Sequence, residues 1–516
     1  MSDQQAPVKV KQSKFNVKLL VIIGIILVGA VGAFAYSFWP TSDKDAYFKA
    51  EIDTFNFLKD QVTDRFENEL AWAELSQEKP TSSTITASAE YNDPYSFGGF
   101  NEIEEIINQS SLTLHTETDM KGKQLLVDAE ANIAGVTFED FRIYLTDKHL
   151  LIELPFLDDA LQVESKDLST ILHEIDPFIF SEDEEYDFSR IFDLDNYPVS
   201  EADQQYIREK YGKFIYDHLP NEAFSSETDN VKINGDNIKA EKITAHLTED
   251  HVKTLLTDLF TEIQNDDRFK EIVEEYLKNS FIEQYEIDEI LAIFDEGLDE
   301  AKEEIADIRL PDGIQSTVWV RNGLIVQREF NFSDVEFDEE LTIKGTHVLD
   351  KDEQILNYEF VVDDGFYTES MSIKADLSNK NGKISDKITF DVTDAQIVYE
   401  AKESKDKGER EFERSIAFLT PYDSGSIHWD GKSSYKKDEM SSSNRIYLEA
   451  EELGGDIFNL QLDVEGKQIR GVEEPNPDSI KDIGKMTEDE LFDYVYFEAQ
   501  EQFFNWYMEN FGMPGF

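Results

Sequence analysis

The most constraining feature of the chain is an uncharged, apolar run near its N-terminus. From Leu19 to Ser42 no residue carries a charge, and the first part of the run reads LLVIIGIILVGAVGAFAYSFW. About 20 apolar residues suffice for a helix to cross the hydrocarbon layer of a membrane. Four lysines and one aspartate precede the run, and cations before a span favour a cytoplasmic N-terminus. We therefore predict a cytoplasmic basic arm over residues 1–18 and a transmembrane helix over residues 19–39.

The same run also fits a cleaved signal peptide. Ala33-Phe34-Ala35 has the small-x-small pattern of a cleavage site after Ala35. Against cleavage, the apolar character continues to Trp39, which makes the run longer than most signal peptides require. In both cases the bulk of the chain lies outside the cytoplasm. We predict a single-pass protein of the cell membrane with its N-terminus inside.

Charge and cysteine usage exclude several classes of protein. The chain has 111 acidic residues against 48 Lys and Arg, a formal net charge of −63 at pH 7. A field of this sign repels nucleic acid, which we exclude as a partner. A disordered acidic chain would lack aromatic residues, but here they make up 12% of the sequence, so cores can form. The absence of cysteine excludes disulfides, thiolate metal sites and cysteine nucleophiles.

Hydrophobic periodicity divides the exported part into four regions. Residues 43–79 read as a long amphipathic stalk helix, and residues 80–308 alternate between strands and helices. Residues 310–472 predict an antiparallel meander with turns at Asn-Gly pairs. Residues 478–516 contain a C-terminal amphipathic helix. The predicted fold class is α+β: one transmembrane helix followed by large antiparallel, curved, half-barrel-like sheets packed with helices.

The stalk helix carries a continuous apolar stripe. Its apolar residues recur every three or four positions, and they are Phe48, Ile52, Phe55, Leu58, Val62, Phe66, Leu70 and Ala73. A strict heptad fails, because it would place Lys59 and Glu69 on the seam. We therefore expect this stripe to lie against its own domain rather than to form an oligomeric stalk.

Aromatic residues gather on the C-terminal helix. Thr487 and Glu490 form a capping box that predicts where the helix begins. The aromatic face that follows includes Tyr494, Phe503, Trp506 and Tyr507. Two interpretations stay open for these four residues: a face that packs on the sheet, or a face that contacts a partner.

No motif for a catalytic, metal or cofactor site is present. The eight histidines are scattered and none belongs to an HExxH sequence. Asp423-Ser424-Gly425-Ser426 lacks the leading glycine of a nucleophile elbow. The sequence also lacks a Walker A motif and a GxGxxG motif. We predict a non-enzymatic protein with no catalytic residues, no metal site and no cofactor.

The layout of strands and helices resembles a known group of carriers. A strand followed by the helix LTEDHVKTLLTDLF within Lys239–Gln264 is later joined by the strand pair STVWVRNGLIVQREFN at Ser316–Asn331. In this layout, over residues 110–470, the chain resembles LolA/LppX-like exported lipid and lipoprotein carriers. It also resembles uncharacterised membrane-anchored envelope proteins of Gram-positive bacteria. The resemblance implies a curved half-barrel whose apolar concave face lies under helices. An anchoring helix and the lack of a lipidated cysteine depart from the carriers.

Two functions follow from these observations. The first is a non-enzymatic, membrane-anchored extracytoplasmic protein that binds a lipid or other hydrophobic ligand in a groove of a curved sheet. The second is a cell-envelope scaffold that docks partners through its sheet edges or its C-terminal aromatic helix. The partners expected are the membrane, through residues 19–39, and either a lipid or an envelope protein.

Overall fold

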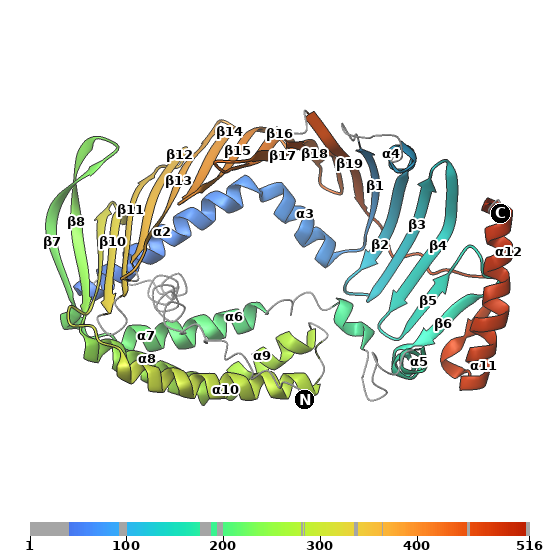
Figure 1. Ribbon diagram of the computed structural model, residues 1–516, viewed down its shortest axis with the longest axis horizontal. Coiled ribbons are helices and arrows are strands. Elements are labelled where there is room, and N and C mark those ends of the chain that lie inside the picture. The colour runs from blue at the N-terminus through green and yellow to red at the C-terminus, as the bar shows by residue number, and fades with distance from the viewer. Residues whose placement is uncertain are drawn as a thin grey trace, which may run out of the picture. The chain divides into compact units, whose positions relative to one another are not determined.

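Figure 1 shows the helices and strands of the computed structural model. The chain forms two compact units, each discontinuous in sequence. The structure describes residues 41–91, 101–175, 187–192, 200–279, 282, 284–334, 339–363, 365–450 and 455–511. Unit 1 comprises residues 1–60, 201–269 and 294–340, and unit 2 comprises residues 61–200, 270–293 and 341–516. The predicted basic arm, the predicted transmembrane helix and the cleavage site after Ala35 lie outside the described residues.

Unit 1 contains four antiparallel strands in sequence order. They are β7 (Phe224–Ile233), β8 (Asp236–Leu247), β9 (Ile314–Arg321) and β10 (Leu324–Asp334). The predicted Asn-Gly turn joins β9 to β10, with φ of 55° at Asn322 and 83° at Gly323. These left-handed values are those of a type I′ hairpin, so that turn prediction is confirmed. In the chain, α6 (Glu201–Ile207) and α7 (Lys213–His218) precede β7, and α8 (Glu249–Gln264), α9 (Asp267–Asn279) and α10 (Gln284–Asp307) lie between β8 and β9.

The core of unit 1 forms between this sheet and its helices. Ile243, Val318 and Ile325 are at most 1% exposed. Helix α2 (Asp43–Arg65) begins in this unit, where its residues Phe48 and Ile52 are buried. The hydroxyl of Thr54 on the same helix accepts a hydrogen bond of 2.9 Å from the backbone N–H of Ile325. The first half of α2 is therefore fixed by apolar burial and by a backbone contact.

Unit 2 is built on a long antiparallel meander. Eight strands follow each other in space and in sequence: β12 (Glu353–Asp363), β13 (Thr368–Lys380), β14 (Lys383–Val392), β15 (Ala395–Asp406), β16 (Glu409–Leu419), β17 (Ser424–Tyr435), β18 (Glu439–Ala450) and β19 (Gly455–Gln468). The second predicted Asn-Gly turn joins β13 to β14, with φ of 55° at Asn381 and 75° at Gly382. β11 (Glu339–Leu349) precedes this meander in the chain.

A strand from the beginning of the chain continues the same sheet. β1 (Thr81–Tyr91) pairs with β19 on one side and with β2 (Ser111–Asp119) on the other, so Thr84 lies between Glu465 and His115. The sheet then runs on through β3 (Gln124–Ile133), β4 (Val136–Thr146), β5 (His149–Glu153) and β6 (Ala160–Glu164). It ends in a parallel pair between β6 and β20 (Ile480–Asp482). The pairing of β1 with β19 joins segments that lie almost 400 residues apart.

Helices of unit 2 lie on or beside this sheet. α3 (Glu67–Glu78) contacts β2 and β17. α4 (Asn101–Asn108) contacts β1, and α5 (Leu168–Ile175) packs near β6. The C-terminal helix consists of α11 (Glu488–Asp493), a π-helical segment (Tyr494–Ala499) and α12 (Gln500–Phe511). Thr487 caps α11 with the predicted capping box to Glu490, so this prediction is confirmed. We call the sheet face that α3 covers the helix-side face.

The predicted fold class was wrong. The twenty strands of the described residues belong to one sheet, whereas several sheets behind a transmembrane helix were expected. The reason is the pairing of β1 with β19, because the periodicity of a sequence shows strands but not which distant strands pair. No helix among the described residues is long and apolar enough to cross a membrane.

Candidate functional site

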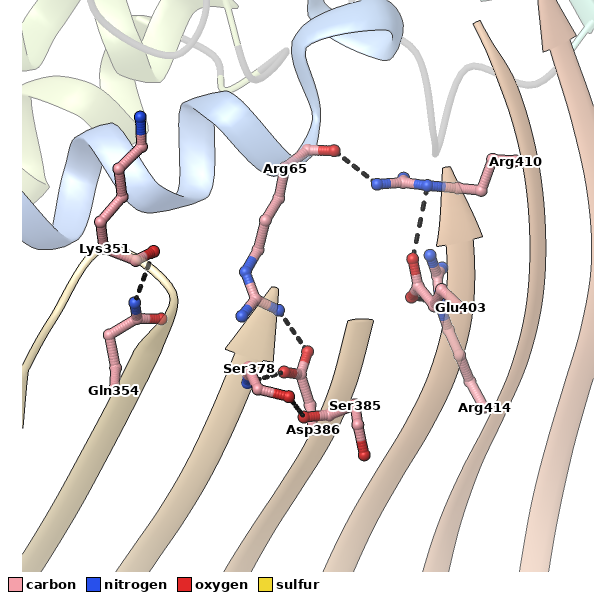
Figure 2. Close-up of polar contacts among 9 residues, drawn as sticks. All are labelled: Arg65, Lys351, Gln354, Ser378, Ser385, Asp386, Glu403, Arg410 and Arg414. Carbon is pink, nitrogen blue, oxygen red and sulfur yellow. Dashed lines mark hydrogen bonds and ion pairs between the residues drawn. The ribbon is translucent and has the colours of Figure 1, made fainter. Parts of the chain in front are cut away.

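The most unusual side chains of unit 2 are charged residues on the helix-side face of the sheet. The strand register places Asp386, Glu403, Arg410 and Arg414 on this face, from three neighbouring strands. Arg65, at the end of α2, points toward them (Figure 2). We call these five residues, together with Glu69 of α3, the ionic cluster.

Charges of the ionic cluster are paired in a chain. The carboxylate of Glu403 accepts a hydrogen bond of 2.8 Å from Arg414 Nε and lies 3.3 Å from Arg410 Nε. Arg410 Nη1 donates to Glu69 at 2.6 Å, and Arg65 Nη1 donates to Asp386. The side chains of Arg410 and Glu403 are only 4% and 5% exposed. Buried charges are tolerated when they are paired in this way, and removing one partner is costly.

Burial has the strongest effect on the carboxyl of Asp386. It raises the pKa of Asp386 above the usual range, although the hydrogen bond and charge of Arg65 act in the opposite direction. The backbone N–H of Ser378 also donates to this carboxylate, at 3.3 Å (Figure 2). Burial likewise raises the pKa of the neighbouring Tyr399 hydroxyl. The charged form of Asp386 is therefore more costly inside the protein than in water.

The ionic cluster also receives the end of a helix. α2 ends at Arg65 and α3 starts at Glu67, because Phe66 has a non-helical backbone with φ −109° and ψ 23°. The carbonyl oxygens at a helix C-terminus lack partners and carry partial negative charge. Lys405 Nζ donates to the carbonyl of Asp64 at 2.9 Å, and Arg410 Nη2 donates to the carbonyl of Arg65. Two cations of the sheet thus cap the last turn of α2.

A separate polar contact holds the turn between β11 and β12. Gln354 is 2% exposed, and its Nε2 donates to the carbonyls of Asp350 at 2.6 Å and Lys351 at 3.3 Å (Figure 2). His347 Nε2 lies 2.5 Å from the hydroxyl of Tyr358 on the next strand. Both contacts satisfy buried polar atoms within the sheet, which is the usual requirement for such groups.

Three aromatic side chains protrude from turns at one end of the strands of the unit 2 sheet. Phe366 and Tyr367 lie in the turn between β12 and β13 and are 87% and 74% exposed, and Tyr422, in the turn between β16 and β17, is 92% exposed. The antiparallel register puts both turns at the same end of the strands, on either side of the turn of the β14–β15 hairpin. At ~4.8 Å per strand, the two turns lie roughly 19 Å apart. We call these turns the aromatic tips.

Local hydrogen bonds order the aromatic tips. Asp363 accepts from the backbone N–H of Gly365 at 2.9 Å and from the Thr368 hydroxyl at 2.7 Å. These two bonds lower the pKa of Asp363, the hydroxyl contributing most. In the other turn, the Thr420 hydroxyl accepts from the backbone N–H of Asp423 at 3.0 Å. Between the tips, at this end of the strands, lies a cavity of about 570 Å³. It is lined by Met371, Val392, Leu419 and Pro421 together with polar side chains that include Asp391.

Residues predicted on the C-terminal helix divide between two environments. Tyr494 is 3% exposed, and Lys481 Nζ lies 3.9 Å from the centre of its ring. The other three residues form a chain of ring contacts: Phe503 lies 5.2 Å from Phe156, Trp506 lies 5.7 Å from Phe138 of β4, and Tyr507 lies 6.3 Å from Phe503. Whether any of the four also serves a partner stays a prediction.

Neither the ionic cluster nor the aromatic tips is among the site residues predicted from the sequence. A signal existed for the first: β16 reads EREFERSIAFL, so Arg410 and Arg414 occupy the same alternating positions as Phe412 and Ile416. A cation in the apolar register of a strand needs a buried partner. For the second, the aromatic pair directly after Asp364-Gly365 marked a turn with bulky residues at its tip.

No residue set for catalysis emerges from this geometry. Within the described ranges, no group of three or more His, Cys, Asp or Glu could hold a metal ion. The acids and bases of the ionic cluster are engaged with each other and with the end of α2. The chemistry available to the cluster is to hold a helix, and the chemistry available to the tips is apolar contact.

Comparison with known proteins gives distant structural matches alone. No family model matches the chain, and no curated protein matches it. Among solved structures, a loop-deletion mutant of OmpT, an outer membrane protein of Vibrio cholerae, matches 75% of this chain and 97% of its own at 8% identity and a TM-score of 0.20. A BenF-like porin from Pseudomonas fluorescens Pf-5 matches 76% of this chain and 98% of its own at 6% identity and a TM-score of 0.24. Scores this low do not establish a shared fold.

These findings correct the predicted resemblance and localisation. The resemblance to LolA/LppX-like carriers was wrong, since the matched structures are titled as outer membrane proteins and porins and no family model matches. The prediction of a single-pass protein of the cell membrane is also corrected, because the matched structures are outer membrane proteins and porins. The matched proteins are membrane proteins, and membrane association and the lack of an enzymatic activity stay predictions for this chain.

Both predicted functions were wrong as well. A groove for a hydrophobic ligand under helices requires an apolar lining, but the part of the sheet under α2 and α3 carries the buried charges of the ionic cluster. The matched structures are outer membrane proteins and porins, neither anchored lipid-binding proteins nor envelope scaffolds. The function must therefore be sought in other features of the described residues.

Proposed function

We propose that the protein is a non-enzymatic, membrane-associated protein that contacts a lipid surface with the aromatic tips of its sheet. The observation that carries this proposal is the exposure of Phe366, Tyr367 and Tyr422, at 87%, 74% and 92%. Exposed apolar side chains that gather on one part of a surface mark a site of contact with a membrane or another protein. Aromatic rings favour the membrane–water interface, where one end of the side chain is apolar and the other is wet.

The strength of such a contact follows from the number of rings. Full burial of one large apolar side chain contributes roughly 1.5–3 kcal/mol. Partial burial of three rings then contributes about 5 kcal/mol, which corresponds to a dissociation constant in the range of about 0.1–1 mM. The tips on their own would give a weak and reversible contact that orients this end of the strands toward the lipid.

The charge of the tips selects the kind of lipid. The residues beside the rings include Asp363 and Asp423, and neither turn contains a lysine or an arginine. With a net charge of −63, the protein is repelled by anionic headgroups. We therefore expect a zwitterionic surface, such as phosphatidylcholine, to be preferred over a phosphatidylglycerol surface.

Hydrogen exchange of the full chain with and without phosphatidylcholine vesicles tests the proposal. We expect vesicles to slow exchange at residues 363–368 and 420–424, and the triple variant Phe366→Ser, Tyr367→Ser, Tyr422→Ser to lose this effect. A matched control replaces three exposed rings of the C-terminal helix: Tyr496→Ser, Phe497→Ser, Phe504→Ser. These are 57%, 64% and 60% exposed. Unchanged exchange at both tips in the unmodified protein would contradict the proposal.

A further inference from the structure

The segment Gln61–Glu78, which we call the arm, is attached to the unit 2 sheet mainly through polar contacts. It comprises the last residues of α2 and all of α3, and α3 has no buried residue. Val62 is 56% exposed and Leu70 is 50% exposed, so the predicted apolar stripe does not face the sheet here. The contacts to the sheet instead come from Arg65, Glu69 and the carbonyl groups of the helix end.

Two aromatic residues of the arm, Trp72 and Phe66, add small contacts with the sheet. A Cβ atom placed on Gly466 of β19 would approach the ring of Trp72 to 2.7 Å, so the glycine leaves room for this ring. The ring of Phe66 lies 5.0 Å from the guanidinium of Arg410. By comparison, the first half of α2 buries Tyr47, Phe48 and Ile52. The first half of α2 thus has an apolar contact surface that the arm largely lacks.

The sheet side of the ionic cluster stays paired when the arm is absent. Glu403 lies between Arg410 and Arg414, and all three belong to the sheet. The guanidinium of Arg414 also stacks on Phe412 at 4.3 Å and Trp429 at 4.7 Å. If the arm moved away, Arg65 and Glu69 would return to water and Asp386 would lose its cation. Arg410 would lose Glu69 and the Arg65 carbonyl but keep Glu403.

A neutral carboxyl at Asp386 reduces even this cost. Separating a buried ion pair is expensive chiefly because one charge is left unpaired in a dry place. Asp386 keeps the Ser378 N–H as a donor, and it can take up a proton when Arg65 leaves, because burial favours its uncharged form. The pairs are therefore arranged so that the arm can leave without stranding a charge.

We propose that the arm is an ionic latch: a helical segment that docks on and undocks from the unit 2 sheet as a unit, without unfolding of the sheet. Arg65, Glu69 and the capped helix end are the moving half of the latch, and Asp386, Lys405 and Arg410 are the fixed half. Dissolved salt stabilises the separated charges of the open state, so ionic strength shifts the latch toward the open state.

Hydrogen exchange of the full chain tests the latch. Isolated helices of this length are marginal in water, so amides of the arm exchange once it undocks. We expect exchange of residues 61–78 to become faster between 50 mM and 500 mM NaCl, while β14–β16 stay protected. We expect Glu69→Gln to accelerate exchange of the arm about tenfold, since it removes a charged hydrogen bond. The matched control is Glu400→Gln, whose ion pair with Lys387 is exposed, and it should leave the arm unchanged.

A charge exchange separates the latch from simple damage to the fold. Asp386→Arg alone should accelerate exchange of the arm, and the double variant Arg65→Asp, Asp386→Arg should restore slow exchange. The proposal is overturned if the arm exchanges only together with β14–β16, at one rate that does not depend on salt. Failure of the double variant to restore protection, with the sheet still protected, would also overturn it.

Discussion

The individual residues of β15 show how strongly location decides the value of an ion pair. Glu403 and Glu400 lie three positions apart on opposite faces of this strand, and both have a basic partner. Glu403 is 5% exposed, whereas Glu400 is 51% exposed. The same chemical group is therefore in a low-dielectric interior in one case and in water in the other.

This difference predicts the effect of truncating each residue. Glu403→Ala should lower the free energy of unfolding by about 3–5 kcal/mol, because it removes the buried carboxylate that both Arg410 and Arg414 contact. Glu400→Ala should change it by less than about 1 kcal/mol, as is usual for an exposed pair. Urea unfolding followed by tryptophan fluorescence measures both, and equal effects of the two variants would disprove the buried network.

Asp266 in unit 1 predicts a pH dependence. Its carboxylate is 4% exposed and accepts hydrogen bonds from Tyr211 at 2.6 Å and Tyr206 at 2.8 Å, with Lys210 Nζ at 3.0 Å. Burial on its own would raise the pKa of Asp266, but these donors and the backbone N–H of Phe269 lower it to about 2. A lowered pKa stabilises the fold above the usual value of 3.8, and this stabilisation is lost as the pH falls toward 2.

Asp266→Asn tests this sign. The unmodified protein should lose about 2 kcal/mol more stability between pH 4 and pH 2 than the variant does, since only the carboxylate must be protonated. Thermal unfolding at a series of pH values measures the difference between the two proteins. If the difference grows as the pH falls, rather than shrinking, the assigned direction of the pKa is wrong.

Residue-level features could be predicted from the sequence where their causes are local. The capping box of Thr487 and the turns at Asn322-Gly323 and Asn381-Gly382 depend on neighbours within four positions. The ionic cluster depends instead on the register of three strands and on the approach of α2, which no local pattern encodes. The aromatic tips were visible as residues, but their exposure depends on the sheet around them.

At the scale of elements, the hairpin between β13 and β14 makes a sharp prediction. Gly382 has φ +75°, and a Cβ atom there would lie 2.1 Å from the carbonyl oxygen of Lys405. Gly382→Ala should therefore cost more than about 1 kcal/mol and loosen the pairing of β14. Gly471→Ala is the matched control, because nothing lies within 4 Å of its position. Similar stability of both variants in urea would contradict the turn geometry.

The helix over residues 43–79 illustrates what periodicity does and does not predict. The pattern indicated a helix correctly, apart from the interruption at Phe66. The apolar stripe, however, is buried at Phe48 and Ile52 and exposed at Val62 and Leu70. A helical pattern shows which residues share a face, but the surface that the face meets is decided by tertiary packing.

At the scale of the whole molecule, the deciding event is the pairing of β1 with β19. It connects the strands of residues 81–164 with the later meander, whereas the sequence analysis treated residues 80–308 and 310–472 as separate regions. Contacts of such long range carry no local signature, and closing the loop between them is the slow step expected in folding. This also explains why the predicted half-barrel-like sheets became one sheet.

One measurement tests the central claim, that the aromatic tips meet a lipid surface. The chain has no cysteine, so Tyr422→Cys in the full-length protein gives a single site for an environment-sensitive fluorophore, and Ser434→Cys, at the opposite end of β17, gives the matched control. Addition of phosphatidylcholine vesicles should shift the emission at position 422 to the blue and expose it to lipid-attached quenchers, while position 434 stays unchanged. If vesicles leave the emission at position 422 unchanged, as they do at position 434, the lipid contact of the aromatic tips is contradicted.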